Sequence, residues 1–255
     1  MKIVTLIGTK DKTDFAFYLA HAVRAMKKNV LIVDATKAGN YLNGYFQTVD
    51  SYLPASDEVI HSLNNIDVLC EAANWVDVGE ILRINNITTT NYDCIFIDLD
   101  SIESLLKEWP DSDMTLYVSD SERSNLAGDV PLLHRYFDEK ETNTIRRIHF
   151  DSAYSIPADY IETIMQNRPS FDENSIEFDY DDEEIRLRMM MQHEHVIPYN
   201  KLNKAYKRVL HELSCELFQD MPIRDIANQT KKPFLANLRR KKSENNASHQ
   251  QTIGG

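Results

Sequence analysis

The sequence predicts an α/β protein with a doubly wound, mostly parallel sheet and helices on both faces. Strand-length apolar runs alternate with amphipathic helical segments, which is the order that builds parallel sheets. The chain opens with a buried strand at residues 2–8, a polar loop at 9–13 and a helix from residue 14. A second apolar strand follows at residues 29–34. A strand, tight turn, helix and parallel strand form the unit that commonly places a phosphate at a helix N-terminus.

The remaining segments continue this alternation as far as residue 218. We expect further strands at residues 66–70, 92–98, 114–119 and 145–150. Apolar residues at helical spacing predict helices at residues 76–84, 124–137, 158–165 and 201–218. Residues 37–65 give a weaker signal. Their aromatic and apolar cluster is expected to cap the core, with a contact surface as the alternative: Tyr41, Leu42, Tyr45 and Phe46.

Residues 175–191 break the helix–strand alternation. Apolar residues alternate with acids over 176–180 and with arginines over 185–191, on either side of an acidic turn. Pairing the two halves places Asp179 opposite Arg186, and each such cross-strand pair contributes about 0.2–1 kcal/mol. The sequence therefore predicts an added antiparallel β-hairpin near residues 175–191, which either extends an edge of the parallel sheet or packs over that edge.

The first loop has only part of the chemistry that holds a phosphate. A P-loop reads Gly-x-x-x-x-Gly-Lys-[Ser/Thr], and Lys12 and Thr13 occupy its last two positions. Asp11 replaces the glycine before the lysine, and Leu6 replaces the first glycine. Asp11 adds a Cβ and a negative charge where phosphate oxygens would lie. Like charges about 4 Å apart cost about 1 kcal/mol in water and about 4 kcal/mol at an effective dielectric near 20, so nucleotide binding is expected to be weak or absent.

Several motifs, in order along about residues 1–220, resemble the ParA/MinD family of deviant P-loop ATPases. Residues 30–36 resemble the family's VLLIDxD strand, and residues 92–98 resemble its Walker B strand, YDxIIID. The later matches are to the next strand and to the IPYD and AYR segments, at residues 114–122, 197–200 and 204–208. The resemblance implies the ParA/MinD fold and a set of vestigial or weak nucleotide-binding residues: Gly8, Lys12, Thr13, Asp34 and Asp98.

Departures from the family pattern bear directly on activity. The family's loop begins with a lysine that reaches the partner's nucleotide in a dimer, and this position is Ile7 here. The second aspartate of the DxD pattern, which helps to position the attacking water, is Thr36. The resemblance therefore implies no catalytic residue and no metal site. The pilus-assembly branch of the family also has an atypical loop, so the loss of the loop pattern does not by itself show that nucleotide binding is lost.

An alternative to a vestigial nucleotide site is that Lys12, Thr13 and Asp98 are solvated polar residues at strand ends.

Composition favours a cytoplasmic protein. No apolar run approaches the roughly 18 residues of a membrane span, and the chain begins with a core strand, so no signal peptide is visible. Cys70, Cys94 and Cys215 lie far apart and are expected to be reduced thiols. His193 and His195 would share one face of a strand, but no third ligand is evident, so we expect a polar strand end.

The C-terminal segment differs in charge from the rest of the chain. Residues 231–255 hold six basic residues and one acidic residue, whereas the whole chain has a net charge of −12. We expect an α/β domain at 1–220 and, at 221–255, a basic amphipathic and then flexible tail that loosely resembles the membrane-targeting helix of the MinD branch. Its candidate membrane or partner contacts are Phe234, Leu235, Leu238, Arg239, Arg240, Lys241 and Lys242. The acidic body repels phosphates, so nucleic-acid binding is not expected.

These observations predict a degenerate, catalytically inactive ATPase-like adaptor. The family resemblance places it at the cytoplasmic face of a membrane machine of the pilus, secretion or conjugation type. No cofactor is expected. The expected partners are protein components of that machine, an anionic membrane surface through residues 231–242, and a second copy of the chain in a homodimer. Two alternatives stay open: an active MgATP-dependent dimerising ATPase switch, and a ParA-like partition protein that binds DNA nonspecifically.

Overall fold

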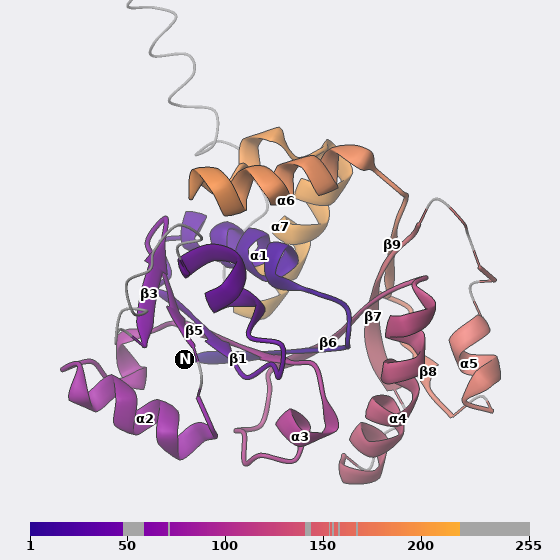
Figure 1. Ribbon diagram of the computed structural model, residues 1–255, viewed down its shortest axis with the longest axis horizontal. Coiled ribbons are helices and arrows are strands. Elements are labelled where there is room, and N and C mark those ends of the chain that lie inside the picture. Colours follow the sequence, from indigo (N-terminus) through magenta and orange to yellow (C-terminus); the bar gives the residue numbers. More distant parts are fainter. Residues whose placement is uncertain are drawn as a thin grey trace, which may run out of the picture. The chain divides into compact units, whose positions relative to one another are not determined.

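The computed structural model has the predicted α/β architecture (Figure 1). It describes residues 1–47, 59–70, 72–140, 144–152, 154, 156–157, 159–166 and 168–219. Within these residues, nine strands form one sheet in the order β3-β4-β2-β5-β1-β6-β7-β8, and β9 also pairs with β7. The strands are β1 (Lys2–Ile7), β2 (Val30–Asp34), β3 (Ile60–Leu63), β4 (Ile66–Leu69), β5 (Cys94–Leu99), β6 (Met114–Asp120), β7 (Thr144–Phe150), β8 (Ser170–Phe171) and β9 (Ile176–Phe178).

The first strand lies at the centre of the sheet. β1 pairs in parallel with β5 on one side and with β6 on the other. β2 and β5 are buried along their whole length, as expected for parallel strands that are covered on both faces. Because the strands around β1 are parallel, their carboxyl ends meet at one edge of the sheet, where ligands of open α/β folds bind. The loop after β1 lies at this edge.

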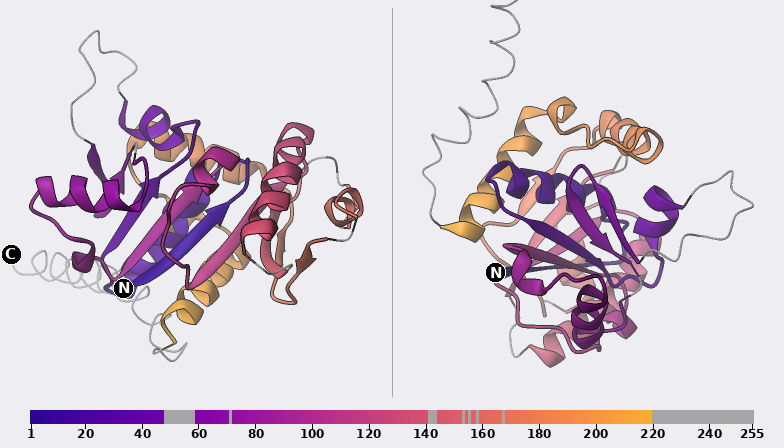
Figure 2. Two further views of the ribbon diagram at one scale, coloured as in Figure 1. Left: turned by 90° about the horizontal axis from the view of Figure 1, so that it is seen from below. Right: turned by 90° about the vertical axis from the view of Figure 1, so that its left-hand side faces the viewer.

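Helices cover both faces of the sheet. In Figures 1 and 2, α1, α6 and α7 lie over one face, and α2, α3 and α4 lie over the other. On the second face, α2 packs against β1, β2 and β5 in one apolar cluster, and α4 packs against β6 and β7 in another. The helices are α1 (Thr13–Ala25), α2 (Trp75–Ile84), α3 (Ile102–Leu105), α4 (Arg123–Glu139), α5 (Tyr160–Ile164), α6 (Asp182–Glu194) and α7 (Lys204–Phe218), with a π-helical turn η1 (Leu42–Phe46).

An antiparallel strand pair lies at the β3 edge of the sheet, in the region with the weak sequence signal. β3 pairs antiparallel with β4, and Ile60 is in register with Leu69. Asn64 and Asn65 connect the two strands with φ values of 50° and 62°. A two-residue hairpin turn of type I′ needs positive φ at both positions, and asparagine tolerates it better than most residues. The sheet therefore has an antiparallel strand pair, but it is formed by residues 60–69 and not by the segment for which a hairpin was predicted.

The hairpin predicted near residues 175–191 is wrong. Its first half is β9, which pairs in parallel with β7, and its second half is the helix α6. Asp179 therefore does not face Arg186 across a hairpin. His193 belongs to α6 and His195 follows it with φ of 50°, so the expected polar strand end is also wrong.

Helix-terminal chemistry explains why α6 forms instead of a strand. The Asp181 side chain accepts a hydrogen bond from the backbone N–H of Glu183 and so caps the helix. Three acidic residues occupy the first turn, where the helix dipole favours negative charge. Glu183 also pairs with Arg186 one turn later. Leu187 and Met191 are the buried residues of α6 and lie four positions apart. The apolar residues that alternate as in a strand therefore also have the spacing of one face of a helix.

The described core belongs to one compact unit, Met1–Leu217. The candidate contacts at residues 231–242 lie outside the described residues, so the division at residue 220 stays a prediction. Cys70 and Cys94 are buried, and none of the three cysteines forms a disulfide bond. Among the described residues, no helix is long and apolar enough to cross a membrane, and no three His, Cys, Asp or Glu side chains form a group suited to a metal ion.

Candidate functional site

The structure brings together the five residues singled out in the sequence. Gly8, Lys12 and Thr13 belong to the turn from β1 into α1, and Asp34 and Asp98 lie near the ends of β2 and β5. Asp34 and Asp98 are direct register partners across these two strands. All five therefore lie at the carboxyl edge of the sheet.

Gly8 permits the chain to leave β1 in a conformation that other residues rarely adopt. Its φ is +139°, and a Cβ built at this position would lie 2.3 Å from the carbonyl oxygen of Val118. Any side chain would therefore displace the neighbouring strand β6. The requirement for glycine at this position is steric and does not depend on phosphate binding.

Lys12 points into the protein and forms a buried ion pair. Its Nζ lies 2.8 Å from Asp98 Oδ1 and donates to the carbonyl oxygen of Gly8 at 2.5 Å. The Tyr41 hydroxyl donates to Asp98 Oδ2 at 2.8 Å. Burial raises the pKa of Asp98, whereas the Lys12 ammonium and the Tyr41 hydroxyl lower it. The lysine that contacts phosphates in a P-loop is thus held by a carboxylate and a carbonyl of the protein itself.

Thr13 is also fully engaged within the protein. Its backbone N–H and its hydroxyl both donate to Asp11 Oδ1, at 3.0 and 2.8 Å. The Tyr45 hydroxyl lies 3.2 Å from Thr13 Oγ1 and acts as the donor, since the Thr13 proton points to Asp11. In a P-loop this threonine hydroxyl binds Mg²⁺. Asp11 therefore takes the hydrogen bonds of the first turn of α1, in addition to placing a charge beside the loop.

Asp34 is held by the residue that replaces the family's water-positioning aspartate. Its Oδ1 accepts from the Thr36 backbone N–H at 3.0 Å and from the Thr36 hydroxyl at 2.5 Å. Burial raises the pKa of Asp34 to about 6, and the nearby Asp98 carboxylate contributes to the rise. Thr36 therefore serves as a hydrogen-bond donor to Asp34, and it lacks the carboxylate needed to orient a water molecule.

A carboxylate from α4 ties down the start of the loop. Asp129 is fully buried, and its Oδ1 accepts from the Thr9 backbone N–H at 2.7 Å and from the Thr9 hydroxyl at 2.8 Å. The Tyr117 hydroxyl donates to Asp129 Oδ2 at 2.7 Å. A phosphate cradle depends on free backbone N–H groups. The N–H of Thr9 is already used, as are those of Gly8, which donates to Leu99, and of Thr13.

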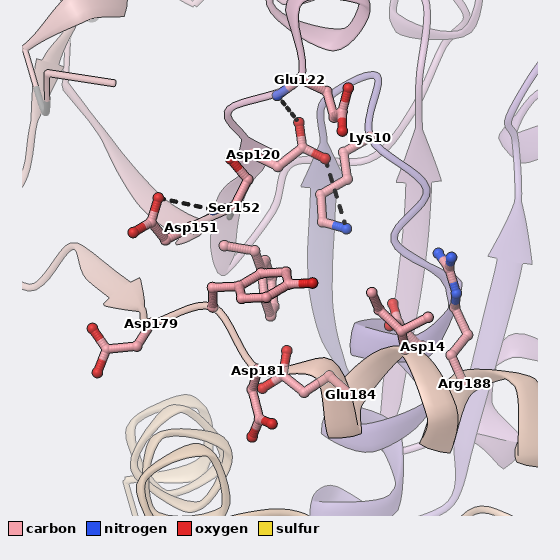
Figure 3. Close-up of a pocket in the computed structure, with 13 residues that line it drawn as sticks. Lys10, Asp14, Asp120, Glu122, Asp151, Ser152, Asp179, Asp181, Glu184 and Arg188 are labelled. Atoms are coloured by element: carbon pink, nitrogen blue, oxygen red, sulfur yellow. Dashed lines mark hydrogen bonds and ion pairs between the residues drawn. The ribbon is translucent and has the colours of Figure 1, made fainter. Parts of the chain in front are cut away.

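A pocket of about 280 Å³ adjoins the loop on the β6 side (Figure 3). Its walls come from the loop, the start of α1, the ends of β6, β7 and β9, and the first two turns of α6. Seven of its thirteen lining residues are acidic, namely Asp14, Asp120, Glu122, Asp151, Asp179, Asp181 and Glu184. Only Lys10 and Arg188 are basic. We call this cavity the acidic pocket, and its charge disfavours a polyphosphate.

The structure decides two sequence expectations and reveals bonding partners that the sequence did not. Lys12, Thr13 and Asp98 are each at most 2% exposed, so the alternative that they are solvated is wrong. Tyr41 and Tyr45 are buried and cap the core as predicted, and their hydroxyls also bond to Asp98 and Thr13. The sequence did not identify Asp129 as a residue of the site, because no sequence pattern around it indicates that it contacts the first loop.

Comparison with known proteins gives the fold. No family model matches the sequence, and no curated protein matches it at a significant level. The MinC:MinD cell division complex of Aquifex aeolicus aligns with a TM-score of 0.56 at 12% identity, covering 88% of this chain and 99% of that chain. A ParA family ATPase from Chlorobium tepidum aligns with a TM-score of 0.55 at 17% identity, covering 84% and 97%. The chain has the ParA/MinD fold.

An ATP complex of a McdA variant from Cyanothece has the same ParA/MinD fold, with a TM-score of 0.52 at 13% identity over 88% of this chain and 98% of that one. At sequence identities this low, the structural similarity shows a shared fold, and any activity has to be argued from the residues at the site. The resemblance read from the motifs is therefore confirmed for the fold.

Proposed function

We propose that this chain is a pseudo-ATPase of the ParA/MinD fold that acts as an assembly adaptor through protein partners. The observation that carries the proposal is the buried Lys12–Asp98 ion pair, which Tyr41 completes. To contact a phosphate, Lys12 would have to leave Asp98 unpaired in a buried position. Leaving one member of a buried pair without its partner costs about 3–5 kcal/mol, which offsets much of what a phosphate contact contributes.

The surrounding loop supports the same proposal. Thr13 donates its hydroxyl proton to Asp11, and the Thr9 N–H donates to Asp129. Ile7 and Thr36 stand where the resemblance places the lysine that crosses the dimer interface and the water-positioning aspartate. An adaptor can act without these groups, whereas an ATP-dependent switch would have to bind and hydrolyse nucleotide with several of them missing or already hydrogen-bonded. MinD, which shares the fold, occurs in a complex with MinC, so protein binding is compatible with this architecture.

We further propose that the adaptor works at the cytoplasmic face of a membrane machine of the pilus, secretion or conjugation type. This step rests on the resemblance to the ParA/MinD family and on the basic tail. A membrane role for the tail also accounts for the strong difference in charge between residues 231–255 and the acidic chain as a whole.

Isothermal calorimetry with MgATP tests the pseudo-ATPase proposal. We expect no saturable heat up to about 1 mM nucleotide, which corresponds to a binding free energy weaker than about −4 kcal/mol. We also expect phosphate release to stay at the background rate. A low-micromolar dissociation constant that disappears in Lys12→Ala would contradict the proposal and favour the MgATP-dependent dimerising switch. Thermal denaturation of Lys12→Ala shows whether that variant is folded at the temperature of the titration.

Vesicle co-sedimentation tests the tail. Each Lys or Arg near an anionic leaflet contributes about 1 kcal/mol, and each buried large apolar side chain contributes about 1.5–3 kcal/mol. The full chain is therefore expected to pellet with anionic vesicles at low salt and less with neutral ones. Leu235→Asp combined with Leu238→Asp should abolish pelleting. If this variant pellets like the wild type, or if the tail retards DNA in a gel and ignores vesicles, the membrane role is wrong.

A further inference from the structure

The outward face of α6 carries large apolar side chains that are open to solvent. Ile185 and Met189 are 48% and 53% exposed, and they lie one turn apart, on the side of the helix opposite the buried Leu187 and Met191. Figure 1 shows α6 at the outer margin of the helices that cover this face of the sheet. Exposed apolar side chains that adjoin one another on a helix are a feature of docking surfaces.

Polar residues of opposite character lie at the two ends of this apolar pair. Helical spacing places Asp182, Ile185, Met189 and His193 on one face of α6, at intervals of three or four residues. Asp182 lies in the first turn, which has three acidic residues, and His193 is the basic residue of the last turn. Both side chains are exposed. We call these four residues the α6 stripe, and along the helix they are acidic, apolar, apolar and basic.

The polar ends of the α6 stripe retain hydrogen-bonding capacity. Asp182 Oδ1 accepts a hydrogen bond from the Tyr180 hydroxyl, and among the described residues its second oxygen, Oδ2, has no partner. Within the same part of the chain, the His193 ring makes no hydrogen bond and no ion pair. Arg186, which lies beside the stripe, is already paired with Glu183. The stripe therefore offers an acceptor at one end and an imidazole N–H donor at the other.

This pattern is complementary to itself in the antiparallel direction. When two copies of α6 pack about a two-fold axis at the level of Leu187, Ile185 of one copy lies opposite Met189 of the other. Asp182 then lies within about 1.5 Å, along the helix axis, of the partner's His193, because each residue advances by about that distance. Parallel packing would instead place the two acidic first turns against each other.

We propose that the α6 stripe binds the α6 stripe of a second copy of this chain, as a two-fold symmetric, antiparallel helix pair. Ile185 packs against the partner's Met189, and the Asp182 carboxylate accepts a hydrogen bond from the partner's His193. The helix dipoles favour the same direction, because the negative first turn of each copy meets the C-terminal turn of the other. No residue of the first loop takes part, so the dimer forms without nucleotide and the inference does not rest on the proposed function.

Other occupants match the α6 stripe less well. An anionic membrane is repelled by the three acidic residues of the first turn. The basic segment at residues 231–242 offers cations to Asp182, but it would bring further cations to His193. A helix of another protein would need the same four positions in the reverse order. A second copy of α6 has this order by symmetry.

The size of α6 sets the strength of association to be expected. The helix has 13 residues and is about 20 Å long. One helix pair of this length buries less surface than the roughly 1,200–2,000 Å² of stable protein interfaces. We therefore expect a reversible dimer with a dissociation constant of about 10–100 µM.

Sedimentation equilibrium of the full chain without nucleotide, from about 5 to about 500 µM, tests the proposal. We expect the wild type to pass from monomer to dimer over this range. Met189→Asp should weaken dimerisation at least about tenfold, because each copy then places a carboxylate against the partner's Ile185. Val76→Asp is the matched control. Val76 lies on α2 and is 71% exposed, so this variant should dimerise like the wild type.

Disulfide cross-linking tests the antiparallel direction. Asp182→Cys combined with His193→Cys should form a covalent dimer on mild oxidation, because each new thiol faces a thiol of the other copy. The two positions lie about 16 Å apart on one helix, so they cannot bridge within a chain. Asp182→Cys alone should stay monomeric in non-reducing gels, since the two copies of this position lie about 15 Å apart along the axis. This single variant also controls for the native cysteines.

Four results would overturn the inference. They are a wild type that stays monomeric at about 500 µM, a Met189→Asp variant that dimerises like the wild type, equal cross-linking of the single and double cysteine variants, and dimerisation only with MgATP. Loss of the dimer in Leu235→Asp combined with Leu238→Asp would identify the tail as the occupant and would also overturn it. Equal thermal denaturation of Met189→Asp and the wild type excludes unfolding as the cause of a loss.

Failure of this inference and failure of the proposed function are distinguishable. A monomeric chain that does not bind MgATP loses the α6 dimer and leaves the pseudo-ATPase proposal intact. A dimer that forms only with MgATP contradicts both and favours the ATPase switch.

Discussion

Replacing Lys12 with methionine is expected to lower the free energy of unfolding by about 3–5 kcal/mol, because it leaves Asp98 buried without its ionic partner. Both side chains are about 1% exposed, so water cannot take the place of the ammonium. Tyr41 still donates one hydrogen bond, which is too little to compensate for the lost charge. Urea denaturation followed by circular dichroism measures the change.

Two companion variants separate the buried pair from a general effect of losing a lysine. Adding Asp98→Asn to Lys12→Met should recover a large part of the loss, because no unpaired charge is then buried. Lys37→Met removes an ion pair with Glu103 in which both side chains are more than 70% exposed, and it should change stability by about 0–1 kcal/mol. A Lys12→Met protein as stable as the Lys37→Met protein would show that Lys12 is solvated in solution.

Gly8→Ala should lower the free energy of unfolding by an amount similar to that expected for Lys12→Met, but for a steric reason. The backbone at φ +139° is unfavourable for an L side chain, and the new Cβ would lie 2.3 Å from the Val118 carbonyl oxygen. Since Val118 belongs to the central part of the sheet, it cannot move without disturbing β6 and β7. We expect the free energy of unfolding to fall by about 4 kcal/mol or more, a size that single substitutions reach only when they cause a specific structural defect. Thermal and urea denaturation provide the measurement.

Gly79→Ala is the matched control for Gly8→Ala. Gly79 lies in α2 at an exposed position, and a Cβ built there has no heavy atom within 4 Å. Alanine is a better helix former than glycine, so this variant should be stabilised by about 0.5–1 kcal/mol. If both variants melt at the wild-type temperature, the tight turn after β1 does not exist as described.

Much of the fold was predictable because its signals are local and strong. The buried and mostly apolar strands β2 and β5, and the amphipathic helices α4 and α7, each carry their own pattern within a short window. The error at residues 182–194 arose because alternation and helical spacing coincide there, and the cap at Asp181 decides between them. The β3–β4 hairpin was missed, although the Asn64-Asn65 pair between short apolar runs is a recognisable hairpin signal.

The sequence predicted which residues lie together at the candidate site, but it did not predict the hydrogen bonds and ion pairs that they form. Spacing identified Lys12 and Thr13, since a turn between a strand and a helix has a recurrent sequence pattern, and the resemblance to the ParA/MinD Walker B strand identified Asp98. The carboxylate of Asp98, which Lys12 contacts, also accepts a hydrogen bond from Tyr41, a residue that comes from a different segment and fills the core. Asp129 reaches Thr9 through the packing of α4 on the sheet. Contacts of this kind come from tertiary structure, and no single window of sequence contains them.

The bond between Thr9 and Asp129 also sets an order of events during synthesis. The two residues are 120 positions apart, so the N-terminal loop cannot complete its hydrogen bonds until the ribosome has released α4. At about 5–20 residues per second, the loop waits about 6–24 s after its own emergence. β1 waits similarly, because its neighbours β5 and β6 are made long after it. The segment that is translated first thus reaches its native contacts only after α4 has emerged, and the nascent chain has to keep an apolar strand in solution until then.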